Sequence, residues 1–287
     1  MIRYVEVAPA RELSPWVACY WSITGRIAAG MAGNRVLPDR CMDVILRFGD
    51  PPANRDRGSL LESFVVGAMT SPAVVWQTGW TDVMGVRFRP GGAPPFLGLP
   101  ASELTDAMVP LDSVWDDAAE LFERTAAVRV SEYEAMGARA AALGARERLR
   151  SRARIVDTTL RRRIETNLAK DPVVSAAMRM IDVQEGRIRM HAIEDRLGIT
   201  QRSLERRFQA QIGLSPKVAS RITRFQSAAG VLRSDPGTPL ARLAVERGYH
   251  DQAHMTREFR EFAGIPPAVY ALERTVGFVQ DTPQTLP

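Results

Sequence analysis

Apolar residues in the C-terminal third of the chain recur at the spacing of an amphipathic helix. Leu204 and Phe208 lie four residues apart, and so do Met255 and Phe259. Residues four apart occupy one face of an α-helix, so each pair predicts a helix with an apolar and a polar face. The apolar face of each helix is expected to pack on a core, and the polar face is left for a partner.

Each of these two helices is preceded by the same signals for a turn. A shorter amphipathic segment ends at Gly198 in one case and at Gly248 in the other, and glycine allows the positive φ of a sharp turn. Thr200 and Asp251 then stand where a side-chain oxygen can accept hydrogen bonds from the first N–H groups of the next helix. A short helix, a turn and a second helix make a helix-turn-helix. The chain carries this arrangement twice, at residues 192–208 and 243–259.

The segment between the two units predicts one long helix. Ser215 and Pro216 form a typical helix start, because a capping residue is followed by proline at the first position. The apolar residues that follow are four and three apart in alternation: Val218, Ile222, Phe225, Ala229 and Leu232. About twenty residues give a helix of about 30 Å, close to the roughly 34 Å between successive major-groove faces of DNA. Such a connector can hold two recognition helices in adjacent grooves, which indicates a DNA-binding protein.

Residues 1–110 show a different pattern, with short apolar runs separated by turns rich in glycine and proline. Runs of this length and spacing are typical of β-strands in a sandwich or a small barrel. The predicted strands cover residues 16–21, 43–48, 64–67, 73–76 and 83–89.

Residues 113–170 are predicted to be helical, with apolar residues at helical spacing in 115–126 and in 149–168. These apolar stripes either pair two subunits or pack on their own domain. The stretch 146–163 is rich in arginine. It either extends a contact with DNA or forms a solvated face, and the second interpretation is favoured.

The second unit and its continuation resemble the signature of the AraC/XylS family of bacterial transcription regulators. The matching residues are Gly248, Tyr249, Asp251, Gln252, Arg257, Phe259, Gly264, Pro267 and Tyr270. The first unit matches at Leu204, Arg206, Phe208 and residues 213–216, and the resemblance covers roughly residues 172–272. One departure is Glu194, which occupies a slot where the family usually has a small alanine. Ala244 supplies that alanine in the second unit, so the leading helix of the first unit is expected to pack differently.

The resemblance also implies which side chains read DNA. The base-reading candidates, carried over by position, are Gln201, Arg202, Glu205 and Arg206 in the first recognition helix and Gln252, Ala253, Thr256 and Arg257 in the second. A groove-facing arginine most often reads guanine, and Gln252 can pair with adenine.

Four further residues are candidates for phosphate contacts. Lys217, Arg221 and Arg224 share one face of the connecting helix, where they either meet phosphates or remain solvated. His254 either touches a phosphate or stabilises the turn.

Charge is unevenly distributed along the chain, whose formal net charge is +5. Residues 1–123 carry 10 basic and 15 acidic side chains, residues 124–170 carry 12 and 5, and residues 171–274 carry 16 and 12. An acidic front domain joined to a basic rear half suits a protein that touches DNA with one end.

The front domain resembles, more loosely, the cupin-like barrel with which AraC-like regulators commonly bind an effector. Residues 37–39 lead into one of its strands and residues 88–92 leave another. Trp21, Trp76 and Trp80 are candidates for the aromatic walls of an effector pocket, and Arg87 for an anion anchor. The alternative is that the tryptophans are core residues and that Arg87 lies on the surface of a strand.

Catalysis is not expected of this domain. Metal-dependent cupins bind their ion mostly through histidine, and all three histidines of the chain (His191, His250 and His254) lie in the C-terminal half. There is neither a phosphate-binding glycine loop nor a serine nucleophile elbow, so no catalytic residue, metal or cofactor is predicted. Cys19 and Cys41 are expected to be buried strand residues.

The expected fold is therefore α+β and multidomain: a β sandwich or cupin-like barrel at 1–112, a helical linker or dimerisation segment at 113–170, an all-α domain with two helix-turn-helix units at 171–274, and a tail at 275–287. The expected function is sequence-specific regulation of transcription, with a front domain that senses a small-molecule effector, dimerises, or both. Two alternatives stay open: the barrel is only a dimerisation or protein-contact module, or it retains a cupin-type activity. Expected partners are double-stranded operator DNA, an effector, a second copy of the chain and RNA polymerase. The compartment is expected to be the cytoplasm, without a membrane span or export signal.

Overall fold

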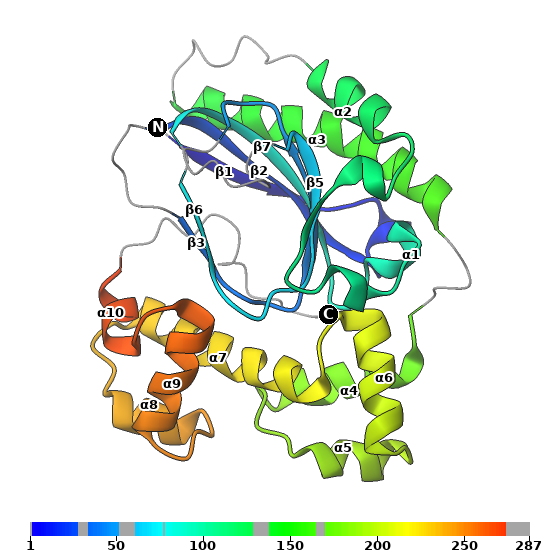
Figure 1. The fold of residues 1–287 in the computed structure, drawn as a ribbon. Helices are drawn as coiled ribbons and strands as arrows, with labels where there is room; N and C mark the ends of the chain where they lie inside the picture. The colour runs from blue at the N-terminus through cyan, green and yellow to red at the C-terminus, as the bar shows by residue number, and fades with distance from the viewer. Residues whose placement is uncertain are drawn as a thin grey trace.

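The computed structural model describes residues 2–27, 34–51, 61–76, 78–128, 138–164 and 170–273. The predicted tail at 275–287 lies outside the described residues, and so does the end of the apolar stripe at 165–168. Figure 1 shows a β-sheet domain with its helices in the upper half and an all-helical domain in the lower half. The predicted class, α+β with an N-terminal β domain and a C-terminal helix-turn-helix domain, is confirmed.

The N-terminal domain is built on a six-stranded antiparallel sheet in the order β1-β2-β7-β4-β5-β8. Its strands are β1 (Arg3–Val7), β2 (Val17–Ile27), β4 (Met42–Arg47), β5 (Ser63–Val66), β7 (Gly79–Phe88) and β8 (Met108–Pro110). A separate two-stranded ribbon pairs β3 (Asn34–Val36) with β6 (Ala73–Val75) and lies beside the helical domain in Figure 1. All five predicted strands are present, whereas β1, β3 and β8 were not predicted.

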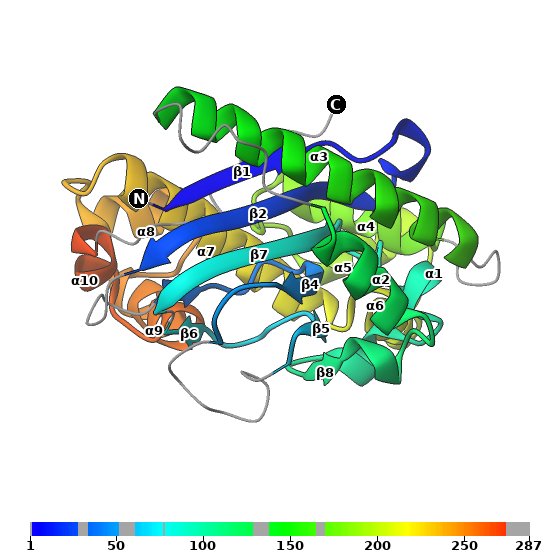
Figure 2. The same cartoon turned by 90° about the horizontal axis from the view of Figure 1, so that it is seen from above.

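The two faces of the large sheet differ because successive side chains of a strand point to opposite sides. On the helix-covered face, Val44 and Val86 belong to the main hydrophobic core. The long helix α3 (Ala138–Arg163) runs across β1 and β2 on this side, as Figure 2 shows. On the opposite face, which we call the inner face, Trp21 and Val83 belong to a smaller buried cluster.

Two arginines attach α3 to the sheet. Arg152 donates hydrogen bonds to both carboxylate oxygens of Asp82, at 2.8 and 3.1 Å, and its guanidinium lies 3.9 Å from the centre of the Phe48 ring. Arg148 lies 3.6 Å from the same carboxylate, and both arginines are buried. The prediction of a solvated arginine face is therefore wrong for these two side chains, since a buried Asp82 requires a counter-charge. The same prediction of a solvated side chain agrees with the structure for Arg146, which is exposed.

The other helices among the described residues of this domain are short. They are α1 (Pro94–Leu97), α2 (Ala118–Ala126) and the 3-10 helices Arg11–Leu13, Ala101–Leu104 and Leu111–Ser113. Trp115 is buried and its indole N–H donates to the carbonyl of Phe96 at 2.8 Å. Leu149, Val156 and Leu160 of α3 are also buried. These apolar residues thus pack on their own domain, and pairing of two subunits stays a prediction.

The C-terminal domain contains seven helices among the described residues: α4 (Pro172–Val183), α5 (Met190–Leu197), α6 (Gln201–Ile212), α7 (Pro216–Ser234), α8 (Leu240–Glu246), α9 (Gln252–Ala263) and α10 (Pro267–Leu272). Helices α5 and α6 form the first helix-turn-helix unit, α8 and α9 form the second, and α7 connects them. The predicted start of α7 is confirmed, since the Ser215 hydroxyl accepts the N–H of Val218 at 3.2 Å. None of the described helices is long and apolar enough to cross a membrane.

Candidate nucleic-acid interface

The first recognition helix, α6, begins where the sequence predicts. Gly198 has a φ of 62°, and the Thr200 hydroxyl accepts the N–H of Ser203 at 3.3 Å. Leu204 and Phe208 are buried in the domain, so the opposite face of α6 is turned to solvent. That face carries all four predicted base-reading residues, each of them exposed: Gln201, Arg202, Glu205 and Arg206. The Gln201 amide donates to the Glu205 carboxylate at 2.9 Å, so these two side chains are paired across one turn.

The second recognition helix, α9, starts with a stronger cap. Gly248 has a φ of 75°, and the Asp251 carboxylate accepts the N–H of His254 at 2.7 Å. This backbone hydrogen bond, together with a side-chain hydrogen bond from the His250 ring, holds the pKa of Asp251 below its usual value. A charged carboxylate at a helix N-terminus also interacts favourably with the helix dipole.

The outward face of α9 carries the predicted base-reading residues of the second unit. Gln252, Ala253 and Arg257 are exposed, while Thr256 is half-buried and its hydroxyl donates to the Gln252 carbonyl at 2.9 Å. A shallow, open hollow of about 490 Å³ lies over this face. Its lining adds one side chain that the sequence analysis missed, Arg260, which lies one turn beyond Thr256 and Arg257.

Aromatic packing fixes the opposite face of α9. Phe259 is fully buried between Phe225 of α7, with ring centroids 5.0 Å apart, and Tyr270 of α10, at 5.6 Å. Met255, one turn earlier, is fully buried as well. These contacts determine which side of α9 remains available to a partner.

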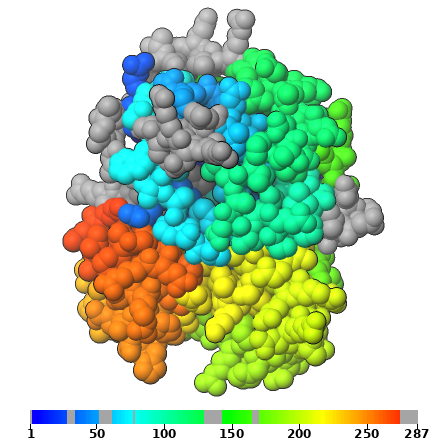
Figure 3. Space-filling view, in the orientation of Figure 1, coloured from blue at the N-terminus to red at the C-terminus, as the bar shows by residue number. Residues whose placement is uncertain are grey.

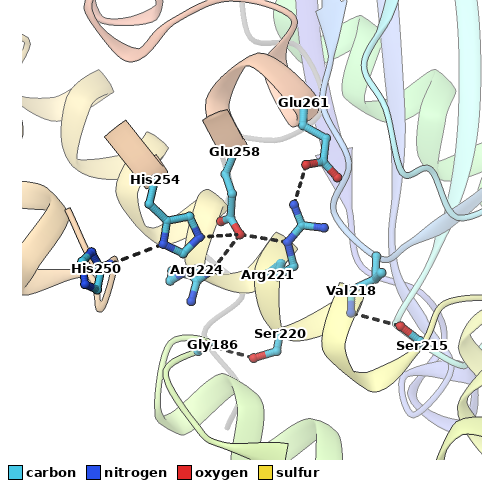
Figure 4. A network of polar contacts seen from close by, with 10 residues as sticks. All are labelled: Gly186, Ser215, Val218, Ser220, Arg221, Arg224, His250, His254, Glu258 and Glu261. Atoms are coloured by element: carbon cyan, nitrogen blue, oxygen red, sulfur yellow. Dashed lines mark hydrogen bonds and ion pairs between the residues drawn. The ribbon is translucent and has the colours of Figure 1, made fainter. Parts of the chain in front are cut away.

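A buried carboxylate joins α9 to α7, as Figure 4 shows. Glu258 accepts hydrogen bonds from Arg221 at 2.8 Å and from Arg224 at 2.6 Å, and its side chain is only 3% exposed. Arg221 also pairs with Glu261 at 2.5 Å, and Arg224 stacks on the Tyr249 ring at 4.6 Å. The expectation that Arg221 and Arg224 are free to meet phosphates therefore does not fit this geometry, because both guanidiniums are held by Glu258.

The other two phosphate candidates differ from each other. Lys217 is exposed at the start of α7, as a phosphate contact requires. The His254 ring packs edge-on against Tyr249, with centroids 5.4 Å apart, and lies 3.6 Å from Glu258. Its second ring nitrogen faces the N–H of His250 at 3.4 Å. This placement favours the alternative in which His254 stabilises the turn.

Comparison with known families agrees with this geometry. Residues 193–272 match a family described as "Helix-turn-helix domain", and residues 5–110 match a domain of unknown function (DUF6597). The C-terminal half contains a helix-turn-helix domain of the AraC type. This match indicates that the C-terminal part of the chain is a DNA-binding domain. No curated protein matches the chain.

Several solved structures share a general likeness with this chain. The C-terminal domain of AraT, a response regulator from Geobacillus stearothermophilus, is 22% identical over 40% of this chain and 93% of its own, with a TM-score of 0.34. Wild-type ToxT from Vibrio cholerae strain SCE256, with a bound unsaturated fatty acid, is 9% identical over 98% of this chain and 97% of its own, with a TM-score of 0.43. The xylose-binding activator XylR is 19% identical over 45% of this chain and 39% of its own, with a TM-score of 0.32.

The two units of the AraC-type domain form separate lobes below the N-terminal domain in Figure 3, the second in orange and the first in yellow and green. The N-terminal domain contacts the C-terminal end of each recognition helix. The Thr105 hydroxyl donates to the carbonyl of Gly213, which caps α6, at 2.5 Å. Arg35 of β3 donates to the carbonyl of Ala263, the last residue of α9, at 2.8 Å. Sequence reasoning missed both contacts, which join residues more than a hundred positions apart.

The four effector candidates of the N-terminal domain are not gathered at one place. Trp21 and Arg87 share the inner face, where the Trp21 indole donates to Asp43 at 2.9 Å and Arg87 pairs with Asp39. Trp80 has the strand parity of the opposite, helix-covered face, and the half-exposed Trp76 follows β6 in the separate ribbon. Trp21 is buried, as the alternative of a core residue expects, whereas Arg87 is buried and not on the surface of its strand.

Burial also changes the chemistry of the inner face. It raises the pKa of the Asp43 carboxyl to about 7, against a hydrogen bond from Trp21 that lowers it. It likewise raises the pKa of the Cys19 thiol to about 12, so the thiol stays protonated and unreactive. Within the described parts of the chain, no group of three or more His, Cys, Asp or Glu is placed to hold a metal ion.

Arg221→Ala is expected to lower the free energy of unfolding by about 1 kcal/mol, because it removes one of two arginines from Glu258 while Arg224 remains. Thermal melts measure this effect. The preferred DNA sequence should not change, since Arg221 faces Glu258 and Glu261. Lys217→Ala, one turn earlier on α7, is the matched control and should leave the melting temperature unchanged. An Arg221 variant that melts like the wild type but binds all DNA more weakly would restore the phosphate role.

Proposed function

We propose that the protein reads a specific operator through the exposed faces of α6 and α9, and that its N-terminal domain controls this reading in response to a small molecule. The observation that supports operator reading is the pair of polar recognition faces, each at the outer side of a helix whose other side is buried. Arg206 and Arg257 occupy equivalent places in the two units and are proposed to contact guanine.

The connecting helix supports simultaneous reading by both units. Helix α7 has 19 residues, which corresponds to a length of about 28 Å. Successive major-groove faces on one side of B-DNA are about 34 Å apart. Two recognition helices held at the ends of α7 can therefore enter adjacent grooves of one duplex.

Selection of bound fragments from a library of random double-stranded DNA by the full-length protein tests this proposal. The expected result is two short conserved blocks whose centres are about one helical turn, roughly 10 base pairs, apart. The double variant Arg206→Ala, Arg257→Ala serves as the control and should lose both blocks. A wild-type protein that enriches no sequence would contradict the proposal.

DNA affinity is expected to fall steeply with salt. Each phosphate that a lysine or arginine neutralises contributes about −0.9 to the slope of log affinity against log salt concentration. Titration of a labelled operator between about 50 and 200 mM salt measures the slope. A Lys217→Ala variant should reduce the magnitude of this slope by about 0.9, the contribution of one phosphate. Glu246→Gln on α8 should leave the slope unchanged. A flat response would argue against arginine and lysine contacts with phosphate.

For the N-terminal domain we propose a ligand site on the inner face, around Trp21 and Arg87. Buried charged and aromatic side chains that converge on one sheet face are a typical setting for recognition of a small molecule with an anionic group. Calorimetric titration with a panel of aliphatic and aromatic carboxylates tests the site. Binding that is lost in Arg87→Gln but kept in Arg124→Gln, an exposed control on α2, is the expected result. If no carboxylate binds, the domain is better explained as a dimerisation or protein-contact module.

A second copy of the chain and RNA polymerase are further proposed partners. Sedimentation of the full-length protein with and without operator DNA tests the first of these. A monomer under both conditions would contradict dimerisation.

A further inference from the structure

Three consecutive residues before β4 contact three different parts of the molecule. The carbonyl of Pro38 accepts a hydrogen bond from the Gln226 amide of α7 at 2.6 Å. Asp39 forms an ion pair with Arg87 on the inner face of the sheet. Arg40 pairs with Asp182, near the end of α4, at 2.6 Å. Residues 38–40, which we call the coupling segment, thus touch the inner face and the DNA-binding domain together.

The coupling segment has little freedom to move one contact without the others. Arg40 has a φ of 69°, in the left-handed region that an arginine rarely adopts. The flanking residues Leu37 and Cys41 are both buried, and the Cys41 N–H donates to the Asp39 carboxylate at 3.0 Å. A shift of the Asp39 side chain therefore disturbs the backbone that carries Arg40 and the Pro38 carbonyl.

The partners of Arg40 and Pro38 in the DNA-binding domain lie on helices that support the two helix-turn-helix units. Asp182 belongs to α4, which packs on α6 of the first unit and on α7. Gln226 lies near the middle of α7, the helix that connects the two units. A displacement of the coupling segment would therefore reach the support of the first recognition helix and the connector at the same time.

We propose that the coupling segment transmits the state of Arg87 to the DNA-binding domain. A ligand whose anionic group takes Arg87 from Asp39 releases Asp39, and the contacts of Pro38 with α7 and of Arg40 with α4 change with it. This inference rests on the proposed function, in which the inner face binds a small molecule and α6 and α9 read DNA. Neither Asp39 nor Arg40 lies on a recognition helix. Both act as positioning residues, through their contacts with Arg87 and Asp182.

Hydrogen–deuterium exchange of the full-length protein tests the transmission without DNA or ligand. Asp39→Asn weakens the pair with Arg87 and keeps an oxygen for the Cys41 N–H. It is expected to raise exchange rates at least about threefold near the end of α4 (179–186) and in α7 around Gln226. Asp43→Asn is the matched control, because Asp43 lies 3.5 Å from the same arginine but belongs to strand β4. It should leave both regions unchanged.

An increase confined to the N-terminal domain, or the same increase in both variants, would overturn the proposal. Should Asp39→Asn fail to fold, Asp182→Asn breaks the same path from the other end. Faster exchange at residues 39–41 in that variant supports the coupling, and unchanged exchange there overturns it.

A double-mutant cycle on operator affinity links the segment to function. Residues without a shared contact normally give additive effects, within about a factor of two. The combination of Asp39→Asn with Asp182→Asn should deviate from the product of the single effects by more than about threefold. The combination of Asp43→Asn with Asp182→Asn should not. Additive effects in the first cycle would overturn transmission to DNA binding, whereas absence of DNA binding by the wild type would count against the proposed function and leave the exchange result standing.

Discussion

Replacement of Phe259 by alanine is expected to lower the free energy of unfolding by about 3–5 kcal/mol. The ring is fully buried between Phe225 and Tyr270, so its removal loses the transfer free energy of the side chain and leaves a cavity that rigid neighbours cannot fill. Since proteins are stable by only about 5–15 kcal/mol, this loss removes a large fraction of the stability of the folded state. Urea denaturation followed by circular dichroism measures the loss.

Val269→Ala provides the matched control. Val269 precedes Tyr270 on α10, and its side chain is about half-exposed, so the variant should stay within about 0.5 kcal/mol of the wild type. Phe208→Ala tests the equivalent site in the first unit, where the ring is also fully buried. If Phe259→Ala and Val269→Ala proved equally stable, the orientation of α9 described above would be wrong.

Arg257→Ala is expected to cost about 1–3 kcal/mol of operator binding and to relax the preference at one position of the site. Arg257 is exposed on the outward face of α9 beside Thr256 and Arg260, and no salt bridge ties its guanidinium to another described residue. Its loss should therefore leave the melting temperature unchanged. Binding to a library randomised at each operator position, together with thermal melts, separates these two effects.

The same measurements apply to Arg206→Ala in the first unit, which should relax a different position of the operator. Arg242→Ala is the control, because Arg242 is exposed on α8, off the recognition helix, and pairs with Glu246 at 2.6 Å. Unchanged sequence preference combined with a lower melting temperature would make the recognition-helix arginines structural. The DNA-facing side of both helices would then have to be reassigned.

Local signals predicted the parts of the fold that depend on neighbours in the chain. Thr200, Ser215 and Asp251 cap the helices that they precede, and the apolar pairs of α6 and α9 are buried as expected. Such features follow from spacing alone, because capping and helical periodicity act within one or two turns. The base-reading roles themselves remain predictions.

Contacts between distant segments could not be predicted in this way. The sequence predicts that Arg221 and Arg224 form an unpaired basic face on α7. Their acidic partner, Glu258, lies more than thirty residues further along the chain, so helical spacing cannot reveal it. For the same reason the sequence predicts solvated side chains for Arg148 and Arg152, whereas in the structure both lie beside Asp82 of the sheet. A helical pattern shows which residues share a face but not what covers that face. The short strands β1 and β3 are missed for a related reason, since their half-buried side chains give no continuous apolar run.

The hydrogen bonds from Thr105 to Gly213 and from Arg35 to Ala263 affect how this regulator can be re-engineered. DNA-binding halves are often treated as interchangeable parts that can be fused to a foreign sensor. Here the carbonyl groups at the ends of both recognition helices receive their donors from the front half of the chain. A chimera that keeps only the C-terminal half would leave these two carbonyl groups to water. The angle between α6 and α9 would then be set only by contacts within that half, such as those of α7 with α4, α9 and α10. A successful exchange of sensors would have to graft a hydroxyl and a guanidinium at these two places as well.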